Sequence, residues 1–184
     1  MKLLVLLFLV FYGIERIVET FWRWKTVKGA IVAPVTLHLL VAAYISMYVV
    51  TLWEWGGLKV GPHTLWAALA AVILVLISMV GRHWAIRTLG LYHSIHIEIR
   101  ENHELIQSGP YGAVRNPYYL SNVIEAIGIP LVASAWLAMT ISIFLYMPLL
   151  ILRLVLEERA LAEKFKDSFA QYKRQAPRIV PKFF

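Results

Sequence analysis

HELIQSGPYGAVRNPYY, residues His103–Tyr119, is a polar segment between two strongly apolar parts of the chain. Gly109 and Pro110 interrupt regular backbone in its middle, so N–H and C=O groups there are free to face a ligand. If the apolar parts lie in a membrane, irregular backbone beside them is tolerated where protein buries it or where it lines a wet cavity. Two interpretations remain open from these residues: a polar connecting loop, or a site for a polar ligand.

The composition of the whole chain is typical of an integral membrane protein. Hydrophobic residues make up 60% of its 184 residues, and the mean hydropathy is +0.67, which is too apolar for a soluble domain of this size. The net charge of +7 comes from basic residues beside the apolar blocks. This placement favours contact with a lipid bilayer, and we expect no nucleic-acid partner. The lack of cysteine excludes disulfides, thiolate metal sites and a cysteine nucleophile.

The apolar segments predict an all-α integral membrane protein with about five transmembrane helices. Three N-terminal spans are expected within residues 1–90, at 2–22, 30–53 and 64–81, the last continuing to about Leu89. Near the end of the first span Glu15, Arg16 and Glu19 lie close together, the last two one turn apart. We favour a position at the membrane interface for these charges, and a polar chamber inside the bundle is the alternative.

The C-terminal half, residues 91–184, is expected to complete a single domain with a polar loop, two spans and a terminal helix. Residues 117–157 are too long for one helix, so we expect a helical hairpin that turns near Pro130. Alternating apolar and polar side chains predict a short extended piece at residues 96–100. Apolar residues at helical spacing predict an amphipathic helix at residues 158–175 that lies on the membrane surface.

The distribution of basic residues predicts the orientation in the membrane. They are dense before the second span, after the third and beyond the fifth, and sparse between the second and third. The positive-inside rule then predicts an N-terminus outside, with the polar loop and the C-terminus in the cytoplasm. Arg153 and Glu157 lie on one helix face at the end of the fifth span. They form either an ordinary helix-end ion pair or, together with the loop, a site.

Several separated motifs resemble those of one known family. They are His103-x-Leu105-Ile106, Gly109-Pro110-Tyr111, Val114-Arg115-Asn116-Pro117-x-Tyr119, Arg153 with Glu157-Glu158-x-x-Leu161, Tyr172, Pro177-Arg178 and Pro181. Over about the C-terminal half of the chain, their order and spacing resemble the signature of the isoprenylcysteine carboxyl methyltransferase superfamily. Further residues, most of them upstream, are similar to a bacterial subgroup that accompanies type III polyketide synthases and O-methylates lipids of the alkylpyrone or alkylresorcinol type: Arg16, Glu19, His38, Trp84, Leu89, Gly90, Glu125, Pro130 and Leu131. This likeness implies a protein of the bacterial inner membrane.

This resemblance implies a membrane methyltransferase that uses S-adenosyl-L-methionine. Its acceptor would be an oxygen, from a carboxylate or an acidic enol or phenol, on a lipophile such as a prenylcysteine or a polyketide-derived lipid. The implied cofactor-binding residues are His96, His103, Glu104, Leu105, Ile106, Gly109, Tyr111, Asn116, Pro117, Tyr118, Tyr119 and Glu157. Arg153 is the implied substrate-binding residue, and Arg153 and Glu157 the implied catalytic ones. No metal is expected. The chain departs from the family at Asn116, where histidine is usual, so hydrogen bonding is kept and a protonatable ring is lost.

These residue types suit methyl transfer from a sulfonium, which mainly needs alignment of the reacting atoms and exclusion of water. Carboxylates and tyrosine hydroxyls can bind the polar parts of the cofactor, and Arg153 can hold an anionic oxygen. An acidic acceptor ionises in water and needs no general base. A neutral phenol would need one, for which Glu157 and His103 are candidates.

Three other functions remain open. A phospholipid N-methyltransferase is expected to share the C-terminal fold, but its amine must lose a proton, which a substrate-facing arginine disfavours. A nicotinamide-dependent sterol-type reductase resembles the C-terminal region, although a larger membrane domain is expected there. A non-catalytic membrane scaffold would need none of the polar residues of the loop. The residues do not select the acceptor or the oligomeric state.

Overall fold

Helices dominate the computed structural model, which describes residues 2–21, 26–57, 65–102 and 104–180. In chain order the elements are α1 (Lys2–Phe21), β1 (Ala30–Val32), α2 (Val35–Gly57), α3 (Leu65–Leu89), the 3-10 turn η1 (Gly90–Tyr92), β2 (Ile97–Ile99), α4 (Pro110–Ala113), α5 (Pro117–Ala133), α6 (Trp136–Ile141), the π-helical turn η2 (Ser142–Tyr146) and α7 (Met147–Gln175). The predicted helical membrane fold is confirmed.

Three helical stretches are long and apolar enough to cross a membrane. They are Val35–Gly57, Leu65–Tyr92 and Trp136–Gln175. Large apolar side chains such as Trp66 and Phe144 point outward from them, as expected where lipid surrounds the bundle. The chain is therefore an integral membrane protein. The total of five spans and their orientation stay predictions, since α5 has only 17 residues and α1 carries several charges.

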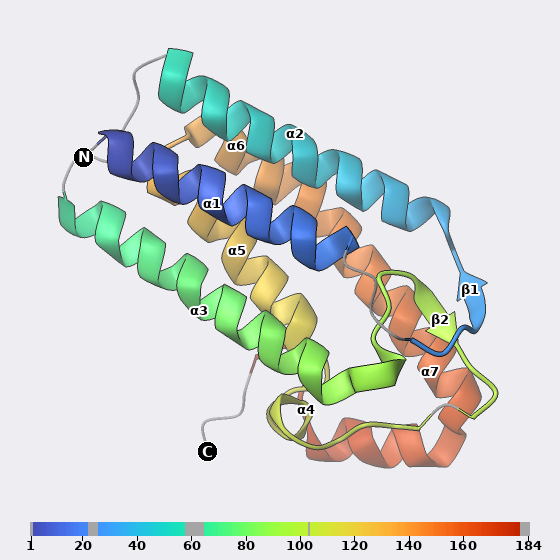
Figure 1. Ribbon diagram of the computed structural model, residues 1–184. Coiled ribbons are helices and arrows are strands. Elements are labelled where there is room, and N and C mark those ends of the chain that lie inside the picture. The colour runs from blue at the N-terminus through green and yellow to red at the C-terminus, as the bar shows by residue number, and fades with distance from the viewer. Residues whose placement is uncertain (1, 22–25, 58–64, 103, 181–184) are drawn as a thin grey trace.

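The helices gather the motif-bearing segments at one end of the bundle (Figure 1). α1, α2 and α3 run alongside one another, with α5 and α6 packed behind them (Figure 1). The start of α1, the end of α2 and the start of α3 lie at one end. β1, β2, α4 and the last part of α7 lie at the other (Figure 1).

The predicted hairpin is formed by α5 and the continuous run of α6, η2 and α7. It turns at Ser134, which has φ 52°, and Ala135 donates its N–H to the Pro130 carbonyl at 2.8 Å. Glu54 of α2 accepts the free N–H groups of Leu137 and Ala138, at 3.1 and 2.8 Å, at the start of α6. A carboxylate there also opposes the positive end of the helix dipole. The hairpin near Pro130 is confirmed.

Close contact between α3 and α5 depends on a small residue. A Cβ at Gly128 would lie 2.7 Å from the Cγ2 atom of Val75, so glycine lets the two backbones approach. This contact aligns α3 with α5 and brings their polar side chains together inside the bundle.

Two short strands correct the predicted start of the second span. β1 pairs antiparallel with β2, with Ala30 opposite Ile99 and Val32 opposite Ile97. The expected extended piece at residues 96–100 is confirmed. The second span was expected to begin at residue 30, but that segment is used for strand pairing, so α2 begins at Val35 and continues to Gly57.

Candidate functional site

A cavity of about 570 Å³ lies where the loop before α5 meets α7. Its walls come from that loop, from α7 and from the inner faces of α1, α2 and α5. The volume is in the range of small-molecule sites in proteins. The structure thus brings the loop and the end of the fifth predicted span together around one space.

Most of the predicted site residues line this cavity. Those that do are His96, Glu104, Leu105, Ile106, Tyr111, Asn116, Tyr118, Tyr119, Arg153 and Glu157. Gly109 and Pro117 do not line it. Gly109 has φ 58° and precedes α4, and Pro117 is the first residue of α5, so both shape the backbone. His103 lies outside the described residues.

Glu157 and Arg153 contact different partners, and no ion pair within 4 Å joins them in the described structure. The Tyr119 hydroxyl donates to Glu157 Oε2 at 2.6 Å, which leaves Oε1 of Glu157 without a protein donor among the described residues. Arg153 is 5% exposed and donates to the Ile95 carbonyl. It also reaches Thr36 Oγ1 at 3.4 Å. Arg153 therefore joins α7 to the segment before β2 and to the start of α2.

Glu158 holds the start of α5 against the C-terminal tail. Its Oε1 accepts from Arg115 Nε at 3.1 Å and from Asn116 Nδ2 at 2.8 Å, and its Oε2 lies 2.9 Å from Arg178 Nη2. Asn116 Nδ2 also donates to the Arg178 carbonyl at 3.1 Å. Asn116 was predicted to bind the cofactor, and its amide nitrogen is engaged in this structural network.

The end of α7 bends over the loop. Lys166 has φ 46° and ψ −114° inside the helix. Beyond this bend, Phe169 and Tyr172 pack with Leu105, and the Tyr172 hydroxyl donates to the Tyr111 carbonyl at 2.6 Å. The amphipathic helix is confirmed, and its position on the membrane surface stays a prediction. Its aromatic face is buried against the loop, because that face covers apolar surface that the loop alone leaves open.

Polar groups without partners face the cavity. His96 Nδ1 is buried with no hydrogen-bond partner. The hydroxyls of Tyr111 and Tyr118 also have no protein partner among the described residues, and both side chains line the cavity. Burial and the nearby Glu157 carboxylate raise the pKa of Tyr111 well above its usual value, so this hydroxyl stays a donor. Buried polar groups without partners are costly, which fits a polar ligand at this end.

A network of buried ion pairs lies inside the bundle, which is the alternative that the sequence analysis did not favour for these charges. Arg82 of α3 is fully buried and contacts Glu15 at 3.0 Å, Glu19 at 2.7 Å and Glu125 at 2.5 Å. Arg16 adds contacts of 2.7 Å to Glu19 and 3.3 Å to Glu125. The interface position favoured for Glu15, Arg16 and Glu19 is wrong, because these charges pair inside the bundle with the buried side chains of Arg82 and Glu125. The sequence did contain a signal for this network, because acidic and basic residues occur within several apolar segments.

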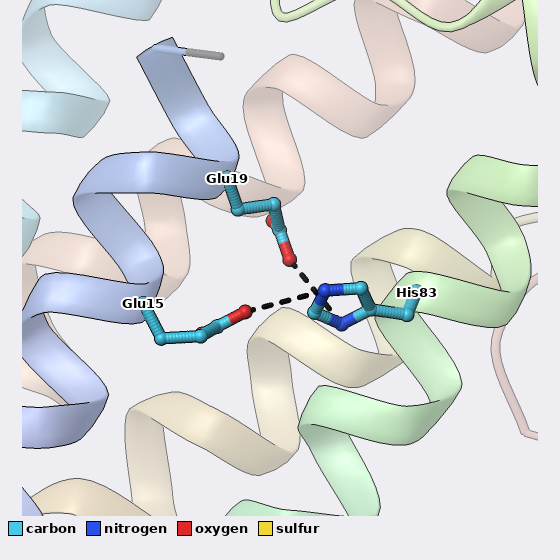
Figure 2. A group of neighbouring side chains, drawn as sticks. All are labelled: Glu15, Glu19 and His83. Atoms are coloured by element: carbon cyan, nitrogen blue, oxygen red, sulfur yellow. Dashed lines mark ion pairs between the residues drawn. The ribbon is translucent and has the colours of Figure 1, made fainter.

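One part of this network consists of residue types that commonly bind metal ions. Glu15 and Glu19 of α1 and His83 of α3 point toward one another (Figure 2). Each places one ligand atom within 4.8 Å of the others. Arg82 already bonds to both carboxylates, at Glu15 Oε2 and Glu19 Oε2. A guanidinium in that position supplies the positive charge that a divalent cation would bring. We therefore assign the group to charge pairing between α1 and α3.

Fold and cavity together define an integral membrane protein whose helical bundle holds a ligand-sized space at one end. A sequence model of the isoprenylcysteine carboxyl methyltransferase family matches residues 71–163. The chain belongs to this family. The eukaryotic intramembrane Ras methyltransferase of this name has a similar fold, with a TM-score of 0.60 at 21% identity over 77% of this chain and 51% of that chain.

Two bacterial relatives are similar in sequence. The uncharacterized protein YpbQ of Bacillus subtilis is 33% identical over 102 residues, which cover 55% of this chain and 60% of YpbQ. The cobalt-zinc-cadmium resistance protein CzcN of Cupriavidus metallidurans is 31% identical over 130 residues, or 70% of this chain and 54% of CzcN. The chain thus spans somewhat more than half the length of these relatives. The expected link to polyketide-associated enzymes stays a prediction.

Proposed function

We propose that this protein is a membrane methyltransferase that moves the methyl group of S-adenosyl-L-methionine to an oxygen of a lipophilic acceptor. One observation carries the proposal: a single cavity has a polar end beside the loop and continues between the apolar helices of the bundle. The polar end holds His96, Tyr111 and Glu157, and side chains of α2 such as Leu40 and Ile45 line the part between the helices. A polar donor and a lipid acceptor can therefore meet in one space.

The residues at the polar end fit the cofactor. When bound, S-adenosyl-L-methionine supplies a sulfonium methyl whose leaving group needs no activation. Glu157 Oε1 can accept hydrogen bonds from its ammonium or hydroxyl groups, and the Tyr111 hydroxyl can donate to its carboxylate. His96 Nδ1, which is buried without a partner, gains one in a complex. Tyr119 holds the Glu157 carboxylate in a fixed orientation through its 2.6 Å hydrogen bond.

Arg153 would orient the acceptor where the polar end meets the part between the helices. Its guanidinium lines the cavity one helical turn before Glu157, and a fixed positive charge holds an ionised oxygen in line for displacement. An acidic acceptor reaches the site already ionised, so no group of the protein has to remove a proton. The carboxylate of an isoprenylcysteine and the acidic enol of a polyketide-derived lipid are both candidate acceptors. The active site is expected on the cytoplasmic side.

Cofactor binding is tested with the purified protein in detergent and S-adenosylhomocysteine, measured by calorimetry. We expect Glu157→Gln to weaken binding at least tenfold, because the loss of charge removes a strong hydrogen-bond acceptor. Glu163→Gln, on the exposed side of α7, is the matched control and should bind as the unchanged protein does. Absence of binding by the unchanged protein would overturn the proposal.

The reaction is tested by incubating the protein with labelled S-adenosyl-L-methionine and a bacterial lipid extract, followed by mass spectrometry. We expect label in an ester or an enol or phenol ether of a lipophile. Label in phospholipid head groups would instead identify an N-methyltransferase. Binding of NADPH without binding of the methyl donor would identify a reductase.

A further inference from the structure

The cavity continues past Arg153 into the bundle, where it reaches a second group of polar side chains. Arg16 of α1, Tyr44 of α2, Asn122 of α5 and Tyr146 of η2 all line it. They touch one another: Arg16 Nη2 donates to Asn122 Oδ1 at 3.2 Å. The Arg16 guanidinium lies 5.5 Å from the centre of the Tyr44 ring, and the rings of Tyr44 and Tyr146 are 5.8 Å apart.

Two members of this group have donors that the protein leaves unused. Asn122 is 3% exposed, and because its Oδ1 accepts from Arg16, its amide nitrogen is the free end. Tyr146 is 2% exposed. Among the described residues, neither the Asn122 amide nitrogen nor the Tyr146 hydroxyl has a hydrogen-bond partner. Neither atom is among the fully buried side-chain atoms without a partner, so both are accessible from the cavity that these residues line.

A local irregularity places the Tyr146 hydroxyl on this wall. Tyr146 ends the π-helical turn η2, and Pro148 follows within two residues. Proline has no N–H to donate to the carbonyl four residues earlier, so the regular helix is interrupted there. The Ser142 hydroxyl fixes the turn by donating to the Ala126 carbonyl of α5 at 2.7 Å. Single π-helical turns of this kind occur often at functional positions.

The charge around Arg16 decides what kind of oxygen this group can hold. Its guanidinium contacts Glu19 at 2.7 Å and Glu125 at 3.3 Å, so its positive charge is already paired. An added anion would stand close to these two carboxylates and would lose its hydration. A neutral oxygen that only accepts hydrogen bonds avoids both costs. A carbonyl oxygen has this chemistry.

We propose that Arg16, Asn122 and Tyr146 form a second subsite that hydrogen-bonds a neutral carbonyl oxygen of the acceptor. The assignment to the acceptor rests on the proposed methyltransferase function. Tyr146 precedes Arg153 by seven residues, roughly 10 Å along a helix. The acceptor would then carry a carbonyl group about that far from the oxygen that receives the methyl group, together with an apolar chain.

The test uses 2-tridecanone, a long-chain ketone, with tridecane and laurate as comparison ligands. Apparent dissociation constants are obtained from the shift in melting temperature during titration at constant detergent. We expect the ketone to bind, and Tyr146→Phe to weaken it about fivefold or more through loss of one hydrogen bond. Tridecane should bind less tightly than the ketone, laurate is a carboxylate that Arg153 can hold, and the variant should not change the binding of either.

Tyr48→Phe is the matched control. Tyr48 also lines the cavity, but its hydroxyl donates to the Leu9 carbonyl, so its loss should leave ketone affinity unchanged. Equal ketone affinity in Tyr146→Phe and the unchanged protein would overturn the subsite. So would a tridecane affinity equal to that of the ketone, or laurate binding that depends on Tyr146. Binding of S-adenosylhomocysteine is measured separately, so failure of the methyltransferase proposal is distinguished from failure of this one.

Discussion

At the scale of single residues, hydrogen bonding separates side chains that hold the fold from those open to a ligand. The Oε1 atom of Glu158 accepts hydrogen bonds from Arg115 and Asn116, and its Oε2 atom accepts one from Arg178. Its neighbour Glu157 has one oxygen bonded to Tyr119 and one facing the cavity. These adjacent glutamates both line the cavity, but protein donors occupy both oxygens of Glu158 and only one oxygen of Glu157.

Tyr119→Phe tests how far the orientation of Glu157 matters. We expect the affinity for S-adenosylhomocysteine to fall about tenfold, because a hydrogen bond to a charged group contributes ~1.5–3 kcal/mol. Calorimetry on the purified variant measures this, with Tyr48→Phe as the control that removes a hydroxyl from another wall of the cavity. An affinity within twofold of the unchanged protein would show that Glu157 needs no help from Tyr119.

His93 makes stability depend on pH. Burial, with a smaller effect of nearby Arg100, lowers the pKa of His93 from 6.5 to about 4, against the opposing charge of Glu19. Between pH 6.5 and 4 the unfolded chain binds a proton at this position and the folded chain does not. Stability is therefore full above pH 6.5 and falls as the pH decreases through this window, by up to ~3 kcal/mol. His93→Gln should show a smaller decrease in melting temperature between pH 7 and 5. Equal decreases would contradict the assignment.

At the scale of elements, short irregular segments place the cavity walls. α4 starts after Gly109, α6 follows the left-handed Ser134, and α7 bends at Lys166. Gly109 and Lys166 change the direction of the chain at the end of the bundle that holds the loop, and Ser134 reverses it at the opposite end, next to Glu54 of α2. The loop, the start of α5 and the end of α7 can meet only because of these changes.

Gly109→Ala should disturb the loop. Its φ of 58° is rare for other residues, and a Cβ would lie 3.0 Å from Thr88 Oγ1, so we expect a loss of about 1–3 kcal/mol in stability. The melting temperature and S-adenosylhomocysteine affinity should both decrease. Gly56→Ala in α2, where a Cβ meets nothing within 4 Å, is the matched control and should not be destabilised. Unchanged melting of Gly109→Ala would contradict the backbone role.

At the scale of the whole molecule, paired charges inside the bundle join helices whose outward apolar side chains face lipid. Three carboxylates, from Glu15, Glu19 and Glu125, surround two guanidinium groups, from Arg16 and Arg82. Apolar contact between helices gives little preference over contact with lipid. The network therefore specifies how α1, α3 and α5 are placed relative to one another.

Arg82→Met should be the most damaging single change in the bundle. It leaves buried carboxylates without their main partner, which costs about 3–5 kcal/mol, and we expect a strongly reduced yield and melting temperature. Arg87→Met, on an exposed position of the same helix, should behave as the unchanged protein. Adding Glu125→Gln to Arg82→Met should restore part of the loss, since one uncompensated charge is removed. A stable Arg82→Met protein would show that the network is dispensable.

The sequence by itself determined the membrane class, the hairpin near Pro130, the short extended piece and the family motifs. These depend on apolar length, backbone chemistry and local spacing, which neighbouring residues specify. Only the tertiary structure decided that Arg16 and Glu19 pair with Arg82 and Glu125, that Asn116 bonds to Glu158, and that Phe169 covers the loop. Partners of this kind come from helices distant in the chain, and a charge or an aromatic ring has several possible partners until packing selects one.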